Sequence, residues 1–132
     1  MTNQPSAPSH SSGFTTLVSG LKQAVPEITV EMTKNLLDNA SNKPFILIDV
    51  REYDEWDRGY IPGAIHVSKG ILERDIEKTV PNRDAKIVLY CGGGSRSLIA
   101  GDNLIKMGYK DVSSMTGGMR GWMSAGYPVA ED

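Results

Sequence analysis

Residues 86–97, Lys-Ile-Val-Leu-Tyr-Cys-Gly-Gly-Gly-Ser-Arg-Ser, decide the fold class of this 132-residue chain. The apolar run over 86–90 is typical of a buried strand, and Cys91 stands at its carboxyl end. Three glycines then lead into a segment whose apolar residues recur at helical spacing as far as Gly108, a residue suited to a helix C-terminus. A strand, a short loop and a helix in this order form the repeating unit of an α/β fold.

The same alternation of apolar runs and amphipathic segments continues along the chain in both directions. Candidate strands lie at residues 28–30, 45–50, 86–90 and 111–115, and a turn at 61–65 leads to a further short strand. Candidate helices lie at residues 14–25, 31–40, 52–58, 68–78, 96–107 and around Trp122. This alternation predicts an α/β fold with a central, mainly parallel, five-stranded sheet that helices flank on both faces.

Apolar side chains at helical spacing indicate which faces are buried. In the helix over 31–40 we expect Met32, Leu36 and Leu37 to form the inward stripe. We also expect Trp56 and Trp122 to be core aromatics, because both lie in short apolar turns against the sheet.

The composition is that of one globular domain, with 39 % hydrophobic and 23 % charged residues and a net charge of −2. The 14 basic residues are scattered, so we expect no nucleic-acid binding. The N-terminus has neither the basic cap nor the apolar core of a targeting or membrane segment, so we expect no membrane association and a cytoplasmic location. Residues 1–13 are predicted to be a flexible tail, and 14–132 the domain, with an N-terminal helix near 14–25.

Cys91 is the only cysteine in the chain, so it cannot form an internal disulfide or a cysteine-rich metal site. Lone cysteines are commonly buried as small hydrophobes. Here the glycines that follow can turn backbone N–H groups toward a shared anion. The positive end of the next helix and the Arg96 guanidinium add to the same field. These features favour the thiolate and predict a reactive cysteine.

Three stretches of the sequence resemble the signatures of rhodanese-like domains. The first joins Asp49-Val-Arg51 and Glu55-Trp56 to residues 59–64, Gly-Tyr-Ile-Pro-Gly-Ala. The second is the loop from Cys91 to Arg96, and the third is Gly117-Gly118 with Gly121-Trp122. The resemblance covers roughly residues 28–129 and implies a central parallel sheet with Cys91 as the sulfur acceptor. Tyr60 stands where the family usually has histidine, a position that we regard as structural.

The resemblance implies a sulfurtransferase with a ping-pong mechanism. The Cys91 thiolate would attack the sulfane sulfur of thiosulfate or of a persulfide, and the resulting Cys91 persulfide would pass its sulfur to a thiol or to cyanide. This chemistry requires no metal and no organic cofactor. Residues expected to bind the substrate are Gly92, Gly93, Gly94, Ser95 and Arg96. Residues expected to support the loop are Asp49, Arg51 and Ser97.

Arg96 is the residue that we expect to hold an anionic donor, and pairing with a surface carboxylate is its alternative role. It is the single cation expected at the loop, so a persulfide donor fits the sequence as well as thiosulfate does. For Asp49 and Arg51 we favour a structural ion pair.

Other cysteine chemistries and a non-catalytic role remain open. Relatives of this fold include phosphatases and arsenate reductases, and the resemblance implies that phosphate users have five residues between cysteine and arginine. Four residues separate Cys91 from Arg96, a spacing that favours sulfur over a tetrahedral oxyanion. A non-catalytic rhodanese-like binding module is the competing class, and a partner protein is a further candidate sulfur acceptor.

Overall fold

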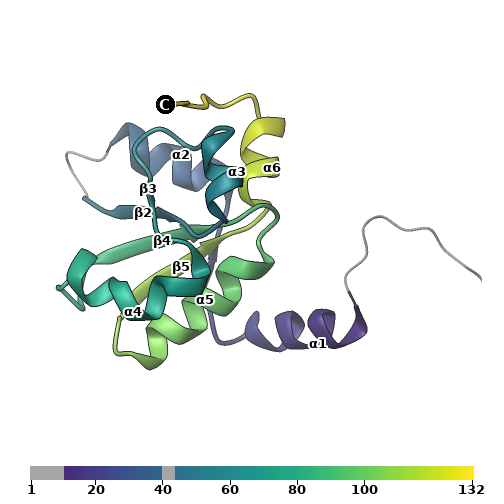
Figure 1. The fold of residues 1–132 in the computed structure, drawn as a ribbon, viewed down its shortest axis with the longest axis vertical. Coiled ribbons are helices and arrows are strands. Elements are labelled where there is room, and N and C mark those ends of the chain that lie inside the picture. The colour runs from purple at the N-terminus through teal and green to yellow at the C-terminus, as the bar shows by residue number, and fades with distance from the viewer. Residues whose placement is uncertain (1–10, 40–43) are drawn as a thin grey trace, which may run out of the picture.

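The structure is a computed structural model that describes residues 11–39 and 44–132. Its strands are β1 (Glu27–Ile28), β2 (Ile46–Asp49), β3 (Ile65–His66), β4 (Lys86–Tyr90) and β5 (Asp111–Met115). They form one sheet in the order β1-β5-β4-β2-β3, and every neighbouring pair is parallel (Figure 1). The expected α/β fold with a five-stranded central sheet is therefore confirmed.

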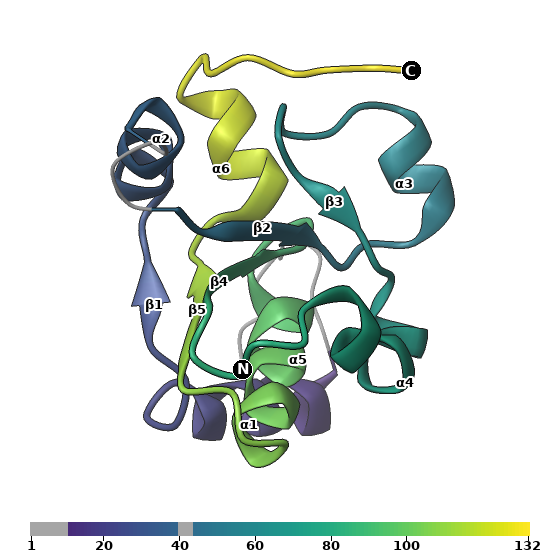
Figure 2. The same ribbon diagram turned by 90° about the vertical axis from the view of Figure 1, so that its left-hand side faces the viewer.

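Six helices in the described residues cover this sheet. They are α1 (Ser12–Leu21), α2 (Val30–Asp38), α3 (Tyr53–Asp57), α4 (Lys69–Thr79), α5 (Ser95–Lys106) and α6 (Gly118–Ser124). The two views show α2, α3 and α6 on one side of the sheet, and α1, α4 and α5 on the other (Figures 1 and 2). The sheet is thus enclosed between two helical layers.

Strand β4 is buried on both faces because successive side chains of a strand point to opposite sides. Ile87 and Leu89 pack into the cluster shared with α4 and α5, and Val88 and Tyr90 pack into the cluster shared with α2 and α6. All four side chains are fully buried. This arrangement explains why β4 is apolar throughout and fixes its carboxyl end, where Cys91 follows.

Helix α2 differs from its expected orientation. Met32 is 55 % exposed, so its predicted inward position is wrong, whereas Val30 and Thr33 are buried. The helix begins at Val30, after the Thr29 side chain accepts a hydrogen bond from the Met32 N–H at 3.0 Å. This start leaves Met32 on the outer face, and the half-buried Leu36 and Leu37 pack against the core as expected.

Helix α1 begins earlier than the sequence predicted. Its N-cap is Ser11, whose hydroxyl accepts a hydrogen bond from the Phe14 N–H at 3.4 Å, and the helix packs on α5 through a small cluster that contains Val18 and Leu98. Residues 1–10 of the predicted tail lie outside the described residues. No helix in the described part of the chain has the length and apolar character to cross a membrane.

Candidate active site

Cys91 lies directly after β4 and is only 1 % exposed. Its Sγ accepts a hydrogen bond from the Gly94 N–H, with nitrogen and sulfur 3.1 Å apart, and the Ser97 Oγ lies 3.5 Å from the same sulfur. Ser97 Oγ lies 2.7 Å from Ser114 Oγ on β5, and both serines are fully buried. The sulfur is therefore held by a backbone donor and backed by a pair of hydroxyl groups.

The loop after Cys91 needs glycine at position 94, and it passes close to Arg120 at position 93. Gly94 is the N-cap of α5 with φ +107°, a left-handed conformation that side chains disfavour, and its N–H points at the sulfur. A Cβ at Gly93 would collide with the guanidinium of Arg120. Ser95 begins α5 and is half-buried beside them. The structure thus brings together all the loop residues that the sequence singled out.

Helix α6 is docked on the active-site loop through its backbone. The Met119 N–H donates to the Cys91 carbonyl at 2.8 Å, and the Arg120 N–H donates to the Gly92 carbonyl at 3.1 Å. Gly118, with φ +55°, permits this approach, because a Cβ there would collide with the Cys91 and Gly92 backbone. This close contact gives a physical reason for the Gly117-Gly118 motif.

Arg96 forms a two-point ion pair with Glu55 of α3. Its Nη1 lies 2.7 Å from Glu55 Oε1, and its Nη2 lies 3.0 Å from Oε2. The hydrogen bonds from Arg96 lower the pKa of Glu55 to about 2, so the carboxylate stays charged and keeps the guanidinium in place. Arg96 thus adopts the alternative role of pairing with a carboxylate. Sequence reasoning missed this partner because it lies 41 residues away.

Arg120 is a second cation at the loop, so the expectation of a single one was wrong. A Cβ at Gly92 would lie 3.1 Å from Arg96 Nη2 and 3.5 Å from Arg120 Nη1, which places both guanidinium groups beside the same residue. Arg120 is exposed, and no ion pair joins it to another residue of the described ranges. Arg120 lies within the third sequence motif, between Gly118 and Gly121, and this position is the signal that could have revealed it.

Asp49 and Arg51 form a buried ion pair at the end of β2, as the sequence suggested. Arg51 Nη2 lies 2.8 Å from Asp49 Oδ2 and donates a second hydrogen bond to the Gly59 carbonyl at 2.7 Å. Burial raises the pKa of the adjacent Tyr90, and the Asp49 charge adds to the effect. The Tyr90 hydroxyl accepts a hydrogen bond from the Ile61 N–H at 3.1 Å. The Asp49–Arg51 ion pair and the Tyr90–Ile61 hydrogen bond together hold the segment that follows β2 against β4.

Tyr60 belongs to an aromatic stack at the edge of the domain. The Trp56 ring stacks on Tyr60 at 3.8 Å and on His66 at 5.0 Å between ring centroids. The Tyr60 hydroxyl donates a hydrogen bond to Asp132 at 2.6 Å, and this bond ties the C-terminal segment, which runs from α6 toward α3 in Figure 2, to the segment that joins α3 to β3. Trp56 is half-buried in this stack, so the expected core position holds only for Trp122, which is 1 % exposed.

A hollow of about 380 Å³ opens over the sulfur, and we call it the cysteine pocket. Its lining residues come from α1, the loop, α5 and α6: Phe14, Cys91, Gly93, Ser95, Arg96 and Arg120. The pocket therefore combines a nucleophile with two guanidinium groups, of which Glu55 neutralises one. Such a site suits a small anion that carries an electrophilic sulfur or phosphorus atom.

Comparison with known proteins agrees with this arrangement. The Rhodanese-like domain family matches residues 29–125. The "putative sulfur carrier protein YrkF" of Bacillus subtilis is 33 % identical over 75 % of this chain and 51 % of its own length. The thiosulfate sulfurtransferase GlpE of Coxiella burnetii is 28 % identical over 67 % of this chain and 80 % of its own length. The chain thus spans only about half of YrkF.

Among solved structures, a Rhodopseudomonas palustris protein of unknown function, described as a possible tyrosine phosphatase, superposes with a TM-score of 0.79. It is 27 % identical, and the match covers 97 % of this chain and all of that one. The family match covers most of the chain and includes the strand, the loop and the helix around Cys91. The chain belongs to the rhodanese-like domain family.

Proposed function

We propose that this protein is a sulfurtransferase that carries a sulfane sulfur as a persulfide on Cys91. The observation that carries the proposal is that Cys91, whose sulfur the Gly94 N–H faces, lines one pocket together with Arg120, a cation that forms no ion pair within the described ranges. The names of the relatives, a sulfur carrier protein and a thiosulfate sulfurtransferase, support the same chemistry.

In the first half-reaction the Cys91 thiolate attacks the outer sulfur of thiosulfate. The new S–S bond forms as the bond between the two thiosulfate sulfurs breaks, and the electron pair leaves with sulfite. The charges balance at −3 on each side, so the step needs no oxidant. Arg120 is suited to bind the sulfonate oxygens, because its guanidinium offers several N–H donors to an oxyanion.

In the second half-reaction a thiolate or cyanide attacks the outer sulfur of the persulfide. The bond to Cys91 Sγ breaks and its electron pair returns to the cysteine, which restores the starting thiolate. The Gly94 N–H, which already faces the sulfur, stabilises the negative charge in both halves. The Ser97 and Ser114 hydroxyl groups support the sulfur from behind.

The second cation shifts the choice of donor toward an anionic one. The sequence offered one cation and left thiosulfate and persulfides equally suited, whereas Arg96 and Arg120 both line the cysteine pocket. Because Glu55 neutralises Arg96, Arg120 supplies the net charge for the donor. We therefore favour thiosulfate or an organic thiosulfonate over a neutral donor.

A phosphatase is the second candidate, because the Rhodopseudomonas palustris structure that superposes on this chain is described as a possible tyrosine phosphatase. Four residues between Cys91 and Arg96 argue against it. The Arg96 guanidinium is also occupied by Glu55, which removes a donor that a phosphate dianion would need.

Intact-protein mass spectrometry after incubation with thiosulfate tests the proposal. We expect the protein to gain the mass of one sulfur atom, to lose it on addition of cyanide, and to show neither change as Cys91→Ser. The absence of any adduct, together with hydrolysis of p-nitrophenyl phosphate, would establish the phosphatase instead. If neither reaction occurs, the protein is a binding module and the sulfurtransferase proposal is wrong.

A further inference from the structure

Two buried hydroxyl groups lie beside the cysteine sulfur but outside the cysteine pocket. Ser97 Oγ of α5 lies 3.5 Å from Cys91 Sγ, and Ser114 Oγ of β5 lies 2.7 Å from Ser97 Oγ. Both serines are 0 % exposed, and neither lines the cysteine pocket. A substrate in the pocket therefore does not touch them, and they act on the reaction only through the Cys91 sulfur.

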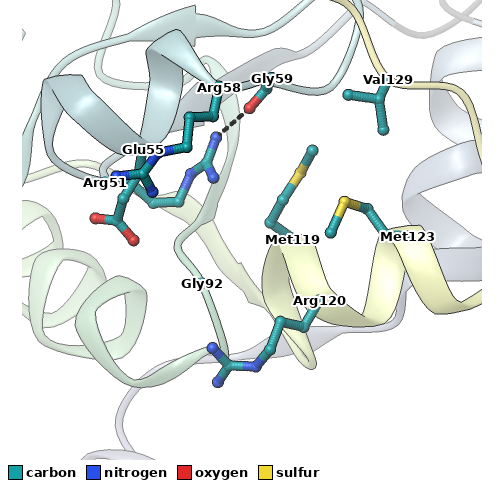
Figure 3. Close-up of a pocket in the computed structure, with 9 residues that line it drawn as sticks. All are labelled: Arg51, Glu55, Arg58, Gly59, Gly92, Met119, Arg120, Met123 and Val129. Atoms are coloured by element: carbon teal, nitrogen blue, oxygen red, sulfur yellow. Dashed lines mark hydrogen bonds between the residues drawn. The ribbon is translucent and has the colours of Figure 1, made fainter.

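The groups suited to bind the donor lie elsewhere around the loop. Arg120 reaches the loop from α6, and its guanidinium lies beside Gly92 (Figure 3). It lines the cysteine pocket together with Arg96. The cations on the pocket side thus account for binding of an anion, and the two serines are left with a different role.

The direction of the hydrogen bond between the two serines follows from the partners that each one has. Within the described ranges, Ser97 Oγ is the one hydrogen-bond partner of the Ser114 hydroxyl. If Ser97 donated to Ser114, the Ser114 proton would be buried without an acceptor, which is a costly arrangement. Ser114 therefore donates to Ser97, and the Ser97 proton is available to another acceptor.

The Ser97 proton has two acceptors within reach. The Gly94 carbonyl oxygen lies 3.3 Å from Ser97 Oγ, which is longer than the roughly 2.5–3.0 Å of an ordinary O–H···O bond. Cys91 Sγ lies 3.5 Å from the same oxygen, a distance that the larger sulfur atom allows. An ionised acceptor forms the stronger hydrogen bond. The proton therefore turns to Cys91 Sγ when this sulfur carries negative charge.

The charge on Cys91 Sγ changes between the two half-reactions. In an ionised persulfide the negative charge lies on the outer sulfur, and it returns to Sγ when the acceptor breaks the S–S bond. A hydrogen bond to Sγ lowers the basicity of the departing thiolate, and a less basic thiolate leaves faster. The same bond makes the thiolate a weaker nucleophile in the loading step. A donor behind the sulfur thus favours discharge over loading.

We propose that Ser97 donates a hydrogen bond to Cys91 Sγ as this sulfur becomes the leaving group, and that Ser114 is the positioning residue that directs the Ser97 proton. In this step the acceptor bonds to the outer sulfur, the S–S bond breaks, and its electron pair returns to Sγ, while the proton stays on Ser97. This inference rests on the proposed sulfurtransferase function. It gives β5 a part in the reaction although the strand does not line the cysteine pocket.

The test measures the two half-reactions separately by rapid mixing. Both are followed at about pH 9.5, where even an unperturbed thiol is mostly ionised. Discharge is the reaction of the preloaded Cys91 persulfide with cyanide, and loading is the reaction of the thiolate with thiosulfate. Ser97→Ala should slow discharge about tenfold and Ser114→Ala about threefold, because the first removes the donor and the second only its support. Neither variant should slow loading, and its loading rate shows that the loop is intact.

A double variant tests whether Ser114 acts through Ser97. Without the Ser97 hydroxyl, Ser114 has no proton to direct, so the double alanine variant should discharge as slowly as Ser97→Ala alone. Ser113→Ala is the matched control, because Ser113 is the neighbouring serine of β5 and faces the other side of the sheet. It should change neither rate.

Equal slowing of loading and discharge by Ser114→Ala would overturn the inference, because a displaced loop impairs both steps. An unchanged discharge rate in Ser114→Ala, or slowing factors that multiply in the double variant, would also overturn it. In these cases the native protein still forms the Cys91 persulfide. Failure of the native protein to form any persulfide would instead overturn the sulfurtransferase function itself.

Discussion

Glu55 and Arg96 are joined by two parallel hydrogen bonds of 2.7 and 3.0 Å, which tie α3 to the first turn of α5. The pair spans the opening of the active-site loop, because Gly92 lies beside both side chains. About 30 % of each side chain is exposed, so the pair is neither fully buried nor freely solvated. The ion pair thus orients the guanidinium of Arg96, the residue with which the active-site loop ends.

This pair predicts a specific acid response. The pKa of Glu55 is lowered from 4.5 to about 2, so its stabilising effect is complete above pH 4.5 and is lost as the pH falls toward 2. Glu55→Gln should lower the free energy of unfolding at pH 7 by about 1 kcal/mol, because a half-exposed pair contributes little more. Urea unfolding at pH 7, 4.5 and 3 should show a shallower loss for the variant than for the native protein.

Asp54→Asn is the control for this acid response, because Asp54 lies on the same helix in an exposed pair with Arg58. It should retain the steep loss of stability below pH 4.5. An identical acid profile for Glu55→Gln and the native protein would mean that the pair contributes nothing to folding.

A substitution at Gly118 should lower the free energy of unfolding strongly, although this residue carries no reactive group. A Cβ there would collide with the Cys91 and Gly92 backbone, and φ is +55°. Gly118→Ala should therefore lower the free energy of unfolding by about 3 kcal/mol or more, and should weaken the docking of α6 on the loop. Gly126 also has a positive φ, +79°, but a Cβ there meets nothing within 4 Å.

Gly126→Ala should thus cost only about 1 kcal/mol, the cost of the left-handed conformation alone. Chemical denaturation of both variants measures the difference. Equal losses would show that the conformation of Gly118, and not its approach to the loop, sets its cost.

The sequence predicted the sheet well, because local patterns determine it. Strands β4 and β5 have the predicted bounds, whereas the strand expected at 28–30 ends at Ile28, because Thr29 caps α2 and Val30 begins that helix. Helix α2 was misoriented at Met32 because its start depends on the Thr29 cap, and moving a helix start changes which side chains face the core.

The cysteine and its loop could also be predicted, whereas their charged neighbours could not. Cys91, the glycines and Ser97 are contiguous, so one stretch of sequence contains them. The pairing of Arg96 with Glu55 and the approach of Arg120 depend on how α3 and α6 pack against the loop. Such contacts between distant segments follow from tertiary packing and leave no periodic signal in the sequence.

Arg120 predicts which substitution weakens binding of an anionic donor. Arg120→Gln removes the unneutralised charge and should raise the KM for thiosulfate about tenfold, whereas Arg120→Lys should raise it about threefold, because the charge remains and the planar donor group is lost. Arg74→Gln is a surface control, since Arg74 lies on α4 and pairs with Asp75. Steady-state assays with cyanide as acceptor measure all three. An unchanged KM in Arg120→Gln would exclude Arg120 from the donor site.

Phe14 predicts that α1 limits the size of the donor. This helix lies outside residues 29–125, which match the family, yet Phe14 lines the cysteine pocket. Phe14→Ala should enlarge the cysteine pocket and raise kcat/KM for benzenethiosulfonate about fivefold relative to that for thiosulfate. The benzene ring of this donor would fill the space that the Phe14 ring occupies in the native protein. Val18, which anchors α1, is unchanged, so the helix should stay in place. Leu17→Ala, at a 52 % exposed position of the same helix, should leave the ratio of the two donors unaltered. An equal ratio in Phe14→Ala and the native protein would show that α1 covers the site without selecting what enters it.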